Sequence, residues 1–140
     1  MLRAGALILL LAVSWMVAAE SRSVWDGVYT KSQAVRGDKL YREACARCHG
    51  ENLAGGDEAP EVAGADFREI WKGKTVGALC DVIRKRMPSD GPGVLSRQES
   101  VDLAAYILSE NEFPVGQKEL PIDDAALQEI RIQPKESAAK

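Results

Sequence analysis

The chain has 140 residues, of which 46% are hydrophobic and 28% charged, and its formal net charge is −3. These values fit one small globular domain with a single core. The acidic balance argues against general nucleic-acid binding, and the odd number of cysteines, three, argues against a disulfide framework.

Residues 1–19 have the pattern of a secretory signal peptide. Arg3 gives the positive start, an uncharged apolar run follows, and small residues end it at Ala19. We expect cleavage after Ala19 and a domain that lies in the periplasm. The alternative is an uncleaved anchor, because the run is only slightly shorter than the about 20 residues that span a bilayer. Membrane attachment is expected in that case alone.

A polar lead-in is expected over residues 20–31 and the main domain over residues 32–110. Thr30, with Gln33 three residues later, has the form of a capping box and predicts the start of a helix. Residues of one helical face then recur at the required spacing as far as Cys45. The first helix therefore leads directly into a cysteine motif.

This motif is Cys45-Ala46-Arg47-Cys48-His49. Two cysteines at this spacing with a histidine directly after the second are typical of the covalent attachment of a c-type haem. On one helical turn both thiols face the same way, so each can form a thioether with a haem vinyl group. His49 can then bind the iron. The motif predicts one covalent haem c per chain.

A loop and a short helix are expected next. Residues 50–64 are rich in Gly, Asp, Glu, Ala and Pro, which indicates tight turns. Asp66 is the expected cap of a short helix that Gly73 ends. A loop of this length is uncommon in so small a domain, and a large apolar cofactor on which it packs would explain it.

A second long helix is expected from Thr75 or Lys74 onwards. Its apolar residues recur at the spacing of an amphipathic helix, and Met87 is the last of them. Pro88 follows at once and disfavours a helical conformation in the residue before it. The helix is therefore predicted to end at or just before Met87.

Ser96 and Glu99 form a second capping-box pattern, which predicts a last helix over about residues 97–110. Residues 111–140 are expected to form a tail that packs on the domain or trails from it, with one or two helical turns near residues 124–130. No alternating strand pattern of useful length is present in the sequence. The predicted fold class is all-α, with three principal helices, a shorter one and long loops.

The second axial ligand of the iron is expected to be Met87. His49 is the only histidine in the chain, and methionine is the other common ligand in electron-carrying c-type cytochromes. Removal of residues 1–19 takes away Met1 and Met16, so Met87 is then the only methionine. The alternative is a core methionine at the end of an amphipathic helix.

Two other chemistries use a similar cysteine spacing. A thiol-disulfide oxidoreductase needs flanking strands, which the sequence does not predict. A zinc site could take Cys45, Cys48, His49 and Cys80, but adjacent residues rarely converge on one tetrahedral ion. Cys80 is expected to be a small buried hydrophobic residue. Trp71 is a candidate donor of its indole N–H to a haem propionate, with a core aromatic residue as the alternative.

Over roughly residues 32–110 the chain resembles class I c-type cytochromes, the small monohaem electron carriers. The residues that carry the resemblance are Gly37, Tyr41, Cys45, Cys48, His49, Pro60, Met87, Pro88 and Tyr106. The resemblance implies a cytochrome c fold in which the first and last helices cross at Gly37 beside Tyr41 and Tyr106. It also implies that the Pro60 carbonyl accepts the imidazole N–H of the haem histidine, which would fix the ring.

The lead-in Ser23–Thr30 and the segment from Phe67 to Pro88 are similar to bacterial cytochrome c domains found beside, or fused to, quinoprotein dehydrogenases. The resemblance implies a one-electron carrier, not an enzyme, between a dehydrogenase and an oxidase or another cytochrome. A haem sensor, a peroxidase-like enzyme with a displaceable Met87, or a permanent dehydrogenase subunit are the alternatives. A basic docking patch could be formed by Arg47, Lys72, Lys74 and Arg84–Arg86, with a solvated helix face as the alternative.

Overall fold

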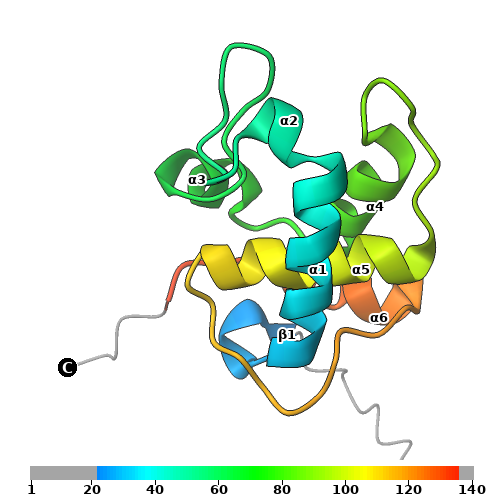
Figure 1. The fold of residues 1–140 in the computed structure, drawn as a ribbon. Coiled ribbons are helices and arrows are strands. Elements are labelled where there is room, and N and C mark those ends of the chain that lie inside the picture. Colours follow the sequence, from blue (N-terminus) through cyan, green and yellow to red (C-terminus); the bar gives the residue numbers. More distant parts are fainter. Residues whose placement is uncertain (1–21, 136–140) are drawn as a thin grey trace, which may run out of the picture.

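The computed structural model describes residues 22–135, so the expected signal peptide lies outside the described residues. Figure 1 shows the long helices α1 and α5 crossing at the centre, with α4 at the upper right and the shorter helices around them. The fold is all-α, as predicted. The elements in chain order are β1 (Arg22–Ser23), the 3₁₀ helix η1 (Val24–Asp26), α1 (Lys31–Ala44), α2 (Ala46–His49), α3 (Ala65–Trp71), α4 (Val76–Arg86), α5 (Arg97–Glu110), α6 (Asp124–Gln128) and β2 (Ile130–Arg131).

Helix α1 begins where the sequence predicts, but only half of its capping box forms. The Thr30 hydroxyl accepts the backbone N–H of Gln33 at 3.2 Å. The Gln33 side chain does not return this bond, because it is fully buried and bonded to the tail. Its amide nitrogen donates to the Leu120 carbonyl at 3.3 Å, and its amide oxygen accepts the Leu120 N–H at 2.8 Å.

Helices α1 and α5 cross at Gly37, as the resemblance implies. A Cβ atom on Gly37 would lie 1.9 Å from the carbonyl oxygen of Asp102, so only glycine allows this approach. Beside the crossing, the rings of Tyr41 and Tyr106 have their centroids 5.3 Å apart. This crossing fixes the angle at which α1 delivers the cysteine motif.

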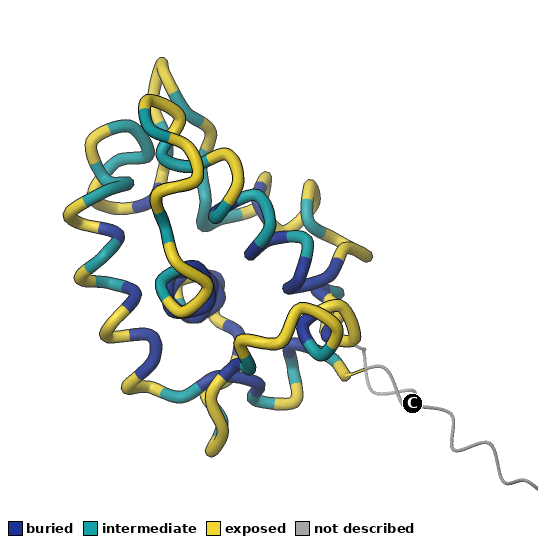
Figure 2. The backbone as a smooth tube through the Cα atoms, turned by 90° about the vertical axis from the view of Figure 1, so that its right-hand side faces the viewer, coloured by how far each residue is buried: buried dark blue, intermediate teal, exposed yellow. Residues whose placement is uncertain are grey.

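Helix α5 is the central element of the core. It begins at a complete capping box, in which the Ser96 side chain accepts the Glu99 N–H and the Glu99 carboxylate accepts the Ser96 N–H. Every residue from Ser100 to Leu108 is buried. Figure 2 looks along α5, whose dark blue coil is surrounded by the other elements.

Helix α4 begins at Thr75, whose hydroxyl accepts the Ala78 N–H at 3.0 Å, and Met87 follows its last residue, as predicted. The expected cap of α3 is wrong. Asp66 lies within the first turn, and the carboxylate of Glu61 takes the capping role from outside the helix. One Glu61 oxygen accepts the N–H groups of Asp66 and Phe67, at 2.7 and 3.1 Å.

The tail, as far as residue 135, packs against the rest of the domain. Its buried side chains include Leu120, Leu127, Ile130 and Ile132. Strands β1 and β2 pair in parallel, with Arg22 opposite Ile130. Two-residue strands carry no alternating pattern that a sequence could reveal, which is why they were not predicted.

Candidate functional site

The cysteine motif lies at a turn between α1 and α2. The backbone N–H of Cys45 donates to the Tyr41 carbonyl at 2.8 Å, so Cys45 continues the hydrogen bonds of α1. The N–H groups of Cys48 and His49 both donate to the Cys45 carbonyl, at 3.1 and 3.0 Å. The three motif side chains therefore project from about one helical turn. Both thiols are free and half-buried.

The imidazole of His49 is held by the loop that follows. Its Nδ1 lies 2.8 Å from the carbonyl oxygen of Pro60. A carbonyl oxygen only accepts, so this contact places the proton on Nδ1 and leaves the lone pair of Nε2 for another partner. The contact implied by the resemblance is thus present. The role of Pro60 in haem binding stays a prediction.

Met87 lies at the end of α4, where its backbone N–H donates to the Ile83 carbonyl at 3.2 Å. Its side chain lines two cavities, and His49 lines the same two. The fold of α4 over α5 thus brings Met87 to the cysteine motif from a distant part of the sequence.

The two cavities have volumes of about 240 and 210 Å³. Both are lined by Cys45, His49, Pro60 and Met87, so they are adjoining parts of one space, which we name the central hollow. The wall of the larger part is almost wholly apolar. It is formed mainly by side chains of α3, α4 and α5: Phe67, Trp71, Leu79, Ile83, Leu103 and Ile107.

Residues 32–107, which include the motif, the loop and Met87, match the family model described as cytochrome c oxidase, cbb3-type, subunit III. The chain belongs to this family. It is a c-type cytochrome domain of the class I monohaem kind, and its cofactor is covalent haem c with its iron.

Two curated relatives are each named "Cytochrome bc1 complex cytochrome c subunit". The one from Corynebacterium diphtheriae is 33% identical over 94 residues, and the one from Corynebacterium efficiens is 32% identical over 97 residues. These matches cover 64% and 66% of this chain but 31% of each relative. The chain therefore matches about a third of the length of these relatives.

A solved structure, the sulfane dehydrogenase SoxCD from Paracoccus pantotrophus, is 23% identical to this cytochrome domain. The similarity covers 74% of this chain and 60% of the other, with a TM-score of 0.47. The family assignment rests on the family model and not on this structure.

The central hollow of the cytochrome domain suits a haem c. It joins a cysteine, a histidine with its Nε2 lone pair available and a methionine thioether around an apolar wall. Burial and the neighbouring Cys48 raise the pKa of the Cys45 thiol to about 11. A thiol-disulfide catalyst needs a lowered thiol pKa, so this environment argues against that alternative.

The zinc alternative is not supported by the positions of the side chains. Among residues 22–135, no group of three or more His, Cys, Asp or Glu side chains is placed to hold a metal ion. Cys80 is buried in the apolar core, and burial raises the pKa of its thiol to about 12. The expectation that Cys80 is a small buried hydrophobic residue is confirmed.

Trp71 lines the larger part of the central hollow. Its ring stacks on Phe67 with centroids 5.9 Å apart, and the Lys74 ammonium lies 4.9 Å from its centroid. Donation of its indole N–H to a haem propionate stays a prediction.

Sequence reasoning missed polar side chains that hold the loop around the motif. The hydroxyl of Tyr41 donates at 2.8 Å to the carbonyl of Gly50, the residue that follows His49. Glu61 caps α3, and the amide of Asn111 binds the loop near Pro60. These contacts join residues without a fixed spacing, so no local pattern signals them.

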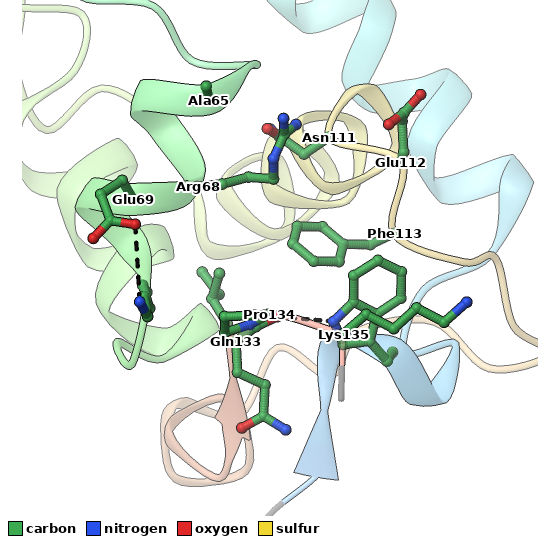
Figure 3. A pocket seen from close by; sticks show the side chains of 12 residues that line it. Ala65, Arg68, Glu69, Asn111, Glu112, Phe113, Gln133, Pro134 and Lys135 are labelled. Carbon is green, nitrogen blue, oxygen red and sulfur yellow. Dashed lines mark hydrogen bonds and ion pairs between the residues drawn. The ribbon is translucent and has the colours of Figure 1, made fainter. Parts of the chain in front are cut away.

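A separate cavity of about 440 Å³ lies between α3, the end of α5 and the tail (Figure 3). It shares no lining residue with the central hollow. Its wall combines the rings of Trp25 and Phe113 with charged side chains that include Arg68, Glu69 and Lys135. Such a mixed wall does not suit a haem, so this separate cavity is not the cofactor site.

The candidate basic patch is locally balanced by carboxylates. Arg47 pairs with Asp90, and Arg84 and Lys85 share Asp81, at 3.3 and 3.0 Å. These pairs fit the alternative of a solvated helix face. Between residues 22 and 135, no helix is both long and apolar enough to span a bilayer.

Proposed function

We propose that this cytochrome domain is a one-electron carrier in which His49 and Met87 are the two axial ligands of the haem iron. The observation that carries the proposal is that both side chains line the same hollow as Cys45, and that the larger part of this hollow has an apolar wall. If His49 and Met87 hold the iron, the chain itself would leave no position open for oxygen or peroxide. This ligand set favours electron transfer over catalysis.

The bound haem supplies one-electron chemistry, with its iron cycling between Fe(III) and Fe(II). The thiols of Cys45 and Cys48 attach it, and Pro60 orients the ring of His49 through the bond to Nδ1. The apolar wall excludes water, and the thioether of Met87 favours the reduced state. His49, held by Pro60, and Met87 at the end of α4 would be the residues that hold the iron in both oxidation states. Trp71 is the proposed donor to a propionate.

The proposed partners are a donor such as a periplasmic quinoprotein dehydrogenase and an acceptor that is an oxidase or another cytochrome. The names of the two Corynebacterium relatives support an exchange of electrons with other redox proteins. We further propose that residues 1–19 are a cleaved signal peptide and that the mature domain is periplasmic. Intact mass of the exported protein tests the cleavage. Copurification of a stoichiometric dehydrogenase would make the chain a permanent subunit instead.

Carbon monoxide binding to the reduced protein tests the axial ligands. We expect no binding to the unchanged protein, because Met87 occupies the position. Met87→Ala should bind carbon monoxide and lose the weak far-red ferric band of methionine coordination. The matched control is Ile83→Ala, since Ile83 lines the same hollow one turn earlier on α4.

Two outcomes would contradict the proposal. Carbon monoxide binding by the unchanged protein would favour a sensor or peroxidase-like enzyme with a displaceable methionine. Identical carbon monoxide binding by the unchanged protein and by the Met87→Ala variant would show that Met87 is not a ligand of the iron.

A further inference from the structure

A buried side-chain amide holds the loop that carries Pro60. Asn111 ends α5, and only 2% of its surface is exposed. Its Nδ2 donates to the carbonyls of Val62 and Ile107, at 3.0 and 2.9 Å, and its Oδ1 accepts the N–H of Gly64 at 3.1 Å. Both amide hydrogens and the amide oxygen are therefore used. Figure 3 shows Asn111 at the edge of the separate cavity.

The same loop is fixed from its other side. The Val62 N–H donates to the Leu53 carbonyl at 2.9 Å. Gly55 packs against the Pro60 peptide so closely that a Cβ there would lie 2.6 Å from the Pro60 carbonyl carbon. Val62 thus bonds to Leu53 through its N–H and to Asn111 through its carbonyl. The loop is held between the end of α5 and the turn that follows the cysteine motif.

The carbonyl that His49 contacts is only two residues before Val62. Hydrogen bonds weaken steeply with distance and misalignment. A shift of Val62 and Gly64 away from α5 would carry the Pro60 carbonyl with it and change the 2.8 Å contact to Nδ1. Asn111 is the side chain that opposes this shift, because it binds the loop on both sides of residue 63.

We propose that Asn111 is a positioning residue that sets the hydrogen bond between Pro60 and His49, and through that bond the reduction potential of the haem. The inference rests on the proposed function, in which His49 binds the iron. A carbonyl that accepts the Nδ1 proton makes the imidazole a stronger electron donor. A stronger donor favours Fe(III), so loosening the contact favours Fe(II) and raises the reduction potential.

The test compares two buried amides that each bridge backbone groups. Asn111→Leu and Gln33→Met are nearly isosteric substitutions, and each replaces a buried side-chain amide by an apolar group. Gln33 is fully buried and bonds both backbone groups of Leu120, but it lines no part of the central hollow. Both variants should be destabilised. Only Asn111→Leu should raise the equilibrium constant for reduction by a one-electron mediator, by about threefold or more.

Nuclear magnetic resonance provides a readout that does not depend on electron transfer. His49 is the only histidine, so selective ¹⁵N labelling of histidine gives one ring N–H signal. In the reduced protein with Asn111→Leu, this signal should move upfield and exchange with solvent faster. With Gln33→Met it should keep its position and exchange rate.

An unchanged ring signal and reduction equilibrium in Asn111→Leu would overturn the inference. Equal changes in the two variants would do the same, because they would reflect general destabilisation. If Asn111→Leu does not fold, the smaller Asn111→Ser replaces it under the same criteria. Failure of the proposed function is distinguishable, because the unchanged protein would then show no histidine coordination in its own spectrum.

Discussion

The cysteines differ in what surrounds each thiol. Cys45 and Cys48 are half-buried and line the central hollow, whereas Cys80 is buried in the core. Burial also raises the pKa of Cys80 to about 12, so this thiol stays protonated and unreactive at neutral pH. Position and environment therefore assign different roles to residues of the same type.

We expect Cys48→Ser to abolish one thioether and to yield little mature protein with covalent haem. Cys80→Ala is the matched control, and it should retain full covalent haem with only a modest loss of stability. A pyridine haemochrome spectrum with intact mass measures both. Normal covalent haem in Cys48→Ser would contradict the attachment proposed for this cysteine.

At the scale of helices, caps formed between residues close in the sequence could be predicted, whereas side-chain contacts between distant residues could not. The hydroxyls of Thr30 and Ser96 cap their helices as the sequence predicts, because a cap depends on residues three apart. Thr75, expected only as one of two possible starting points of α4, also caps its helix. The predicted capping role of Asp66 failed because α3 already begins at Ala65, and Glu61 accepts the N–H groups of Asp66 and Phe67 from the preceding loop. Gln33 is a similar case, since its amide bonds to the distant Leu120.

The candidate site also combines features that the sequence predicts with contacts that only the folded structure reveals. The spacing of the cysteine motif is local and could be predicted from sequence. The Pro60 contact could be expected only from a resemblance, because the loop length does not define it. The clamp by Asn111 depends on where the end of α5 lies relative to the loop. Tertiary packing alone makes such a contact, so a single sequence carries no sign of it.

The crossing of α1 and α5 makes a strong prediction at this scale. Gly37→Ala places a Cβ 1.9 Å from the Asp102 carbonyl oxygen, so the helices must separate. We expect a loss of about 1–3 kcal/mol or more in the free energy of unfolding. Gly91→Ala is the control, because no atom lies within 4 Å of its added Cβ. Denaturant unfolding compares them, and equal stability of the two variants would contradict the close crossing.

The capping box of α5 predicts a pH dependence. The backbone N–H and hydroxyl of Ser96 lower the pKa of Glu99 from its ordinary value of 4.5. The folded state thus favours the ionised carboxylate, and this stabilisation is present above pH 4.5 and lost as the pH falls through the lowered pKa. Glu99→Gln should flatten the fall in stability below pH 4.5, measured by unfolding at a series of pH values. An unchanged slope would exclude Glu99 as a source.

At the scale of the whole molecule, the lead-in and the tail complete the domain around the region matched by the family. Arg36 of α1 binds both Asp102 of α5 and Glu119 of the tail, each at 2.9 Å. The hydroxyl of Tyr29 donates to the Phe113 carbonyl at 2.6 Å. We therefore propose that residues 22–135 fold as one cooperative unit.

Two isoleucines of the tail test this unit. Ile130 is fully buried, whereas 53% of the surface of Ile122 is exposed. Ile130→Ala should cost about 2–5 kcal/mol in the free energy of unfolding, while Ile122→Ala should change it by about 0.5 kcal/mol or less. A single unfolding transition, observed through both the haem and the far-ultraviolet signal, should shift in Ile130→Ala. If Ile130→Ala lowered the free energy of unfolding no more than Ile122→Ala does, the tail would not be needed for the stability of the domain.

The pairing of β1 with β2 also determines how the domain can be tethered. Arg22 lies opposite Ile130, so the first and last described segments run side by side. In Figure 1 β1 lies at the base of the molecule, whereas α2, with Cys48 and His49, lies at the upper end. A linker attached at β1 therefore leaves from the base. An attachment at this point would leave the opposite end of the domain, which carries the cysteine motif, accessible to a partner protein.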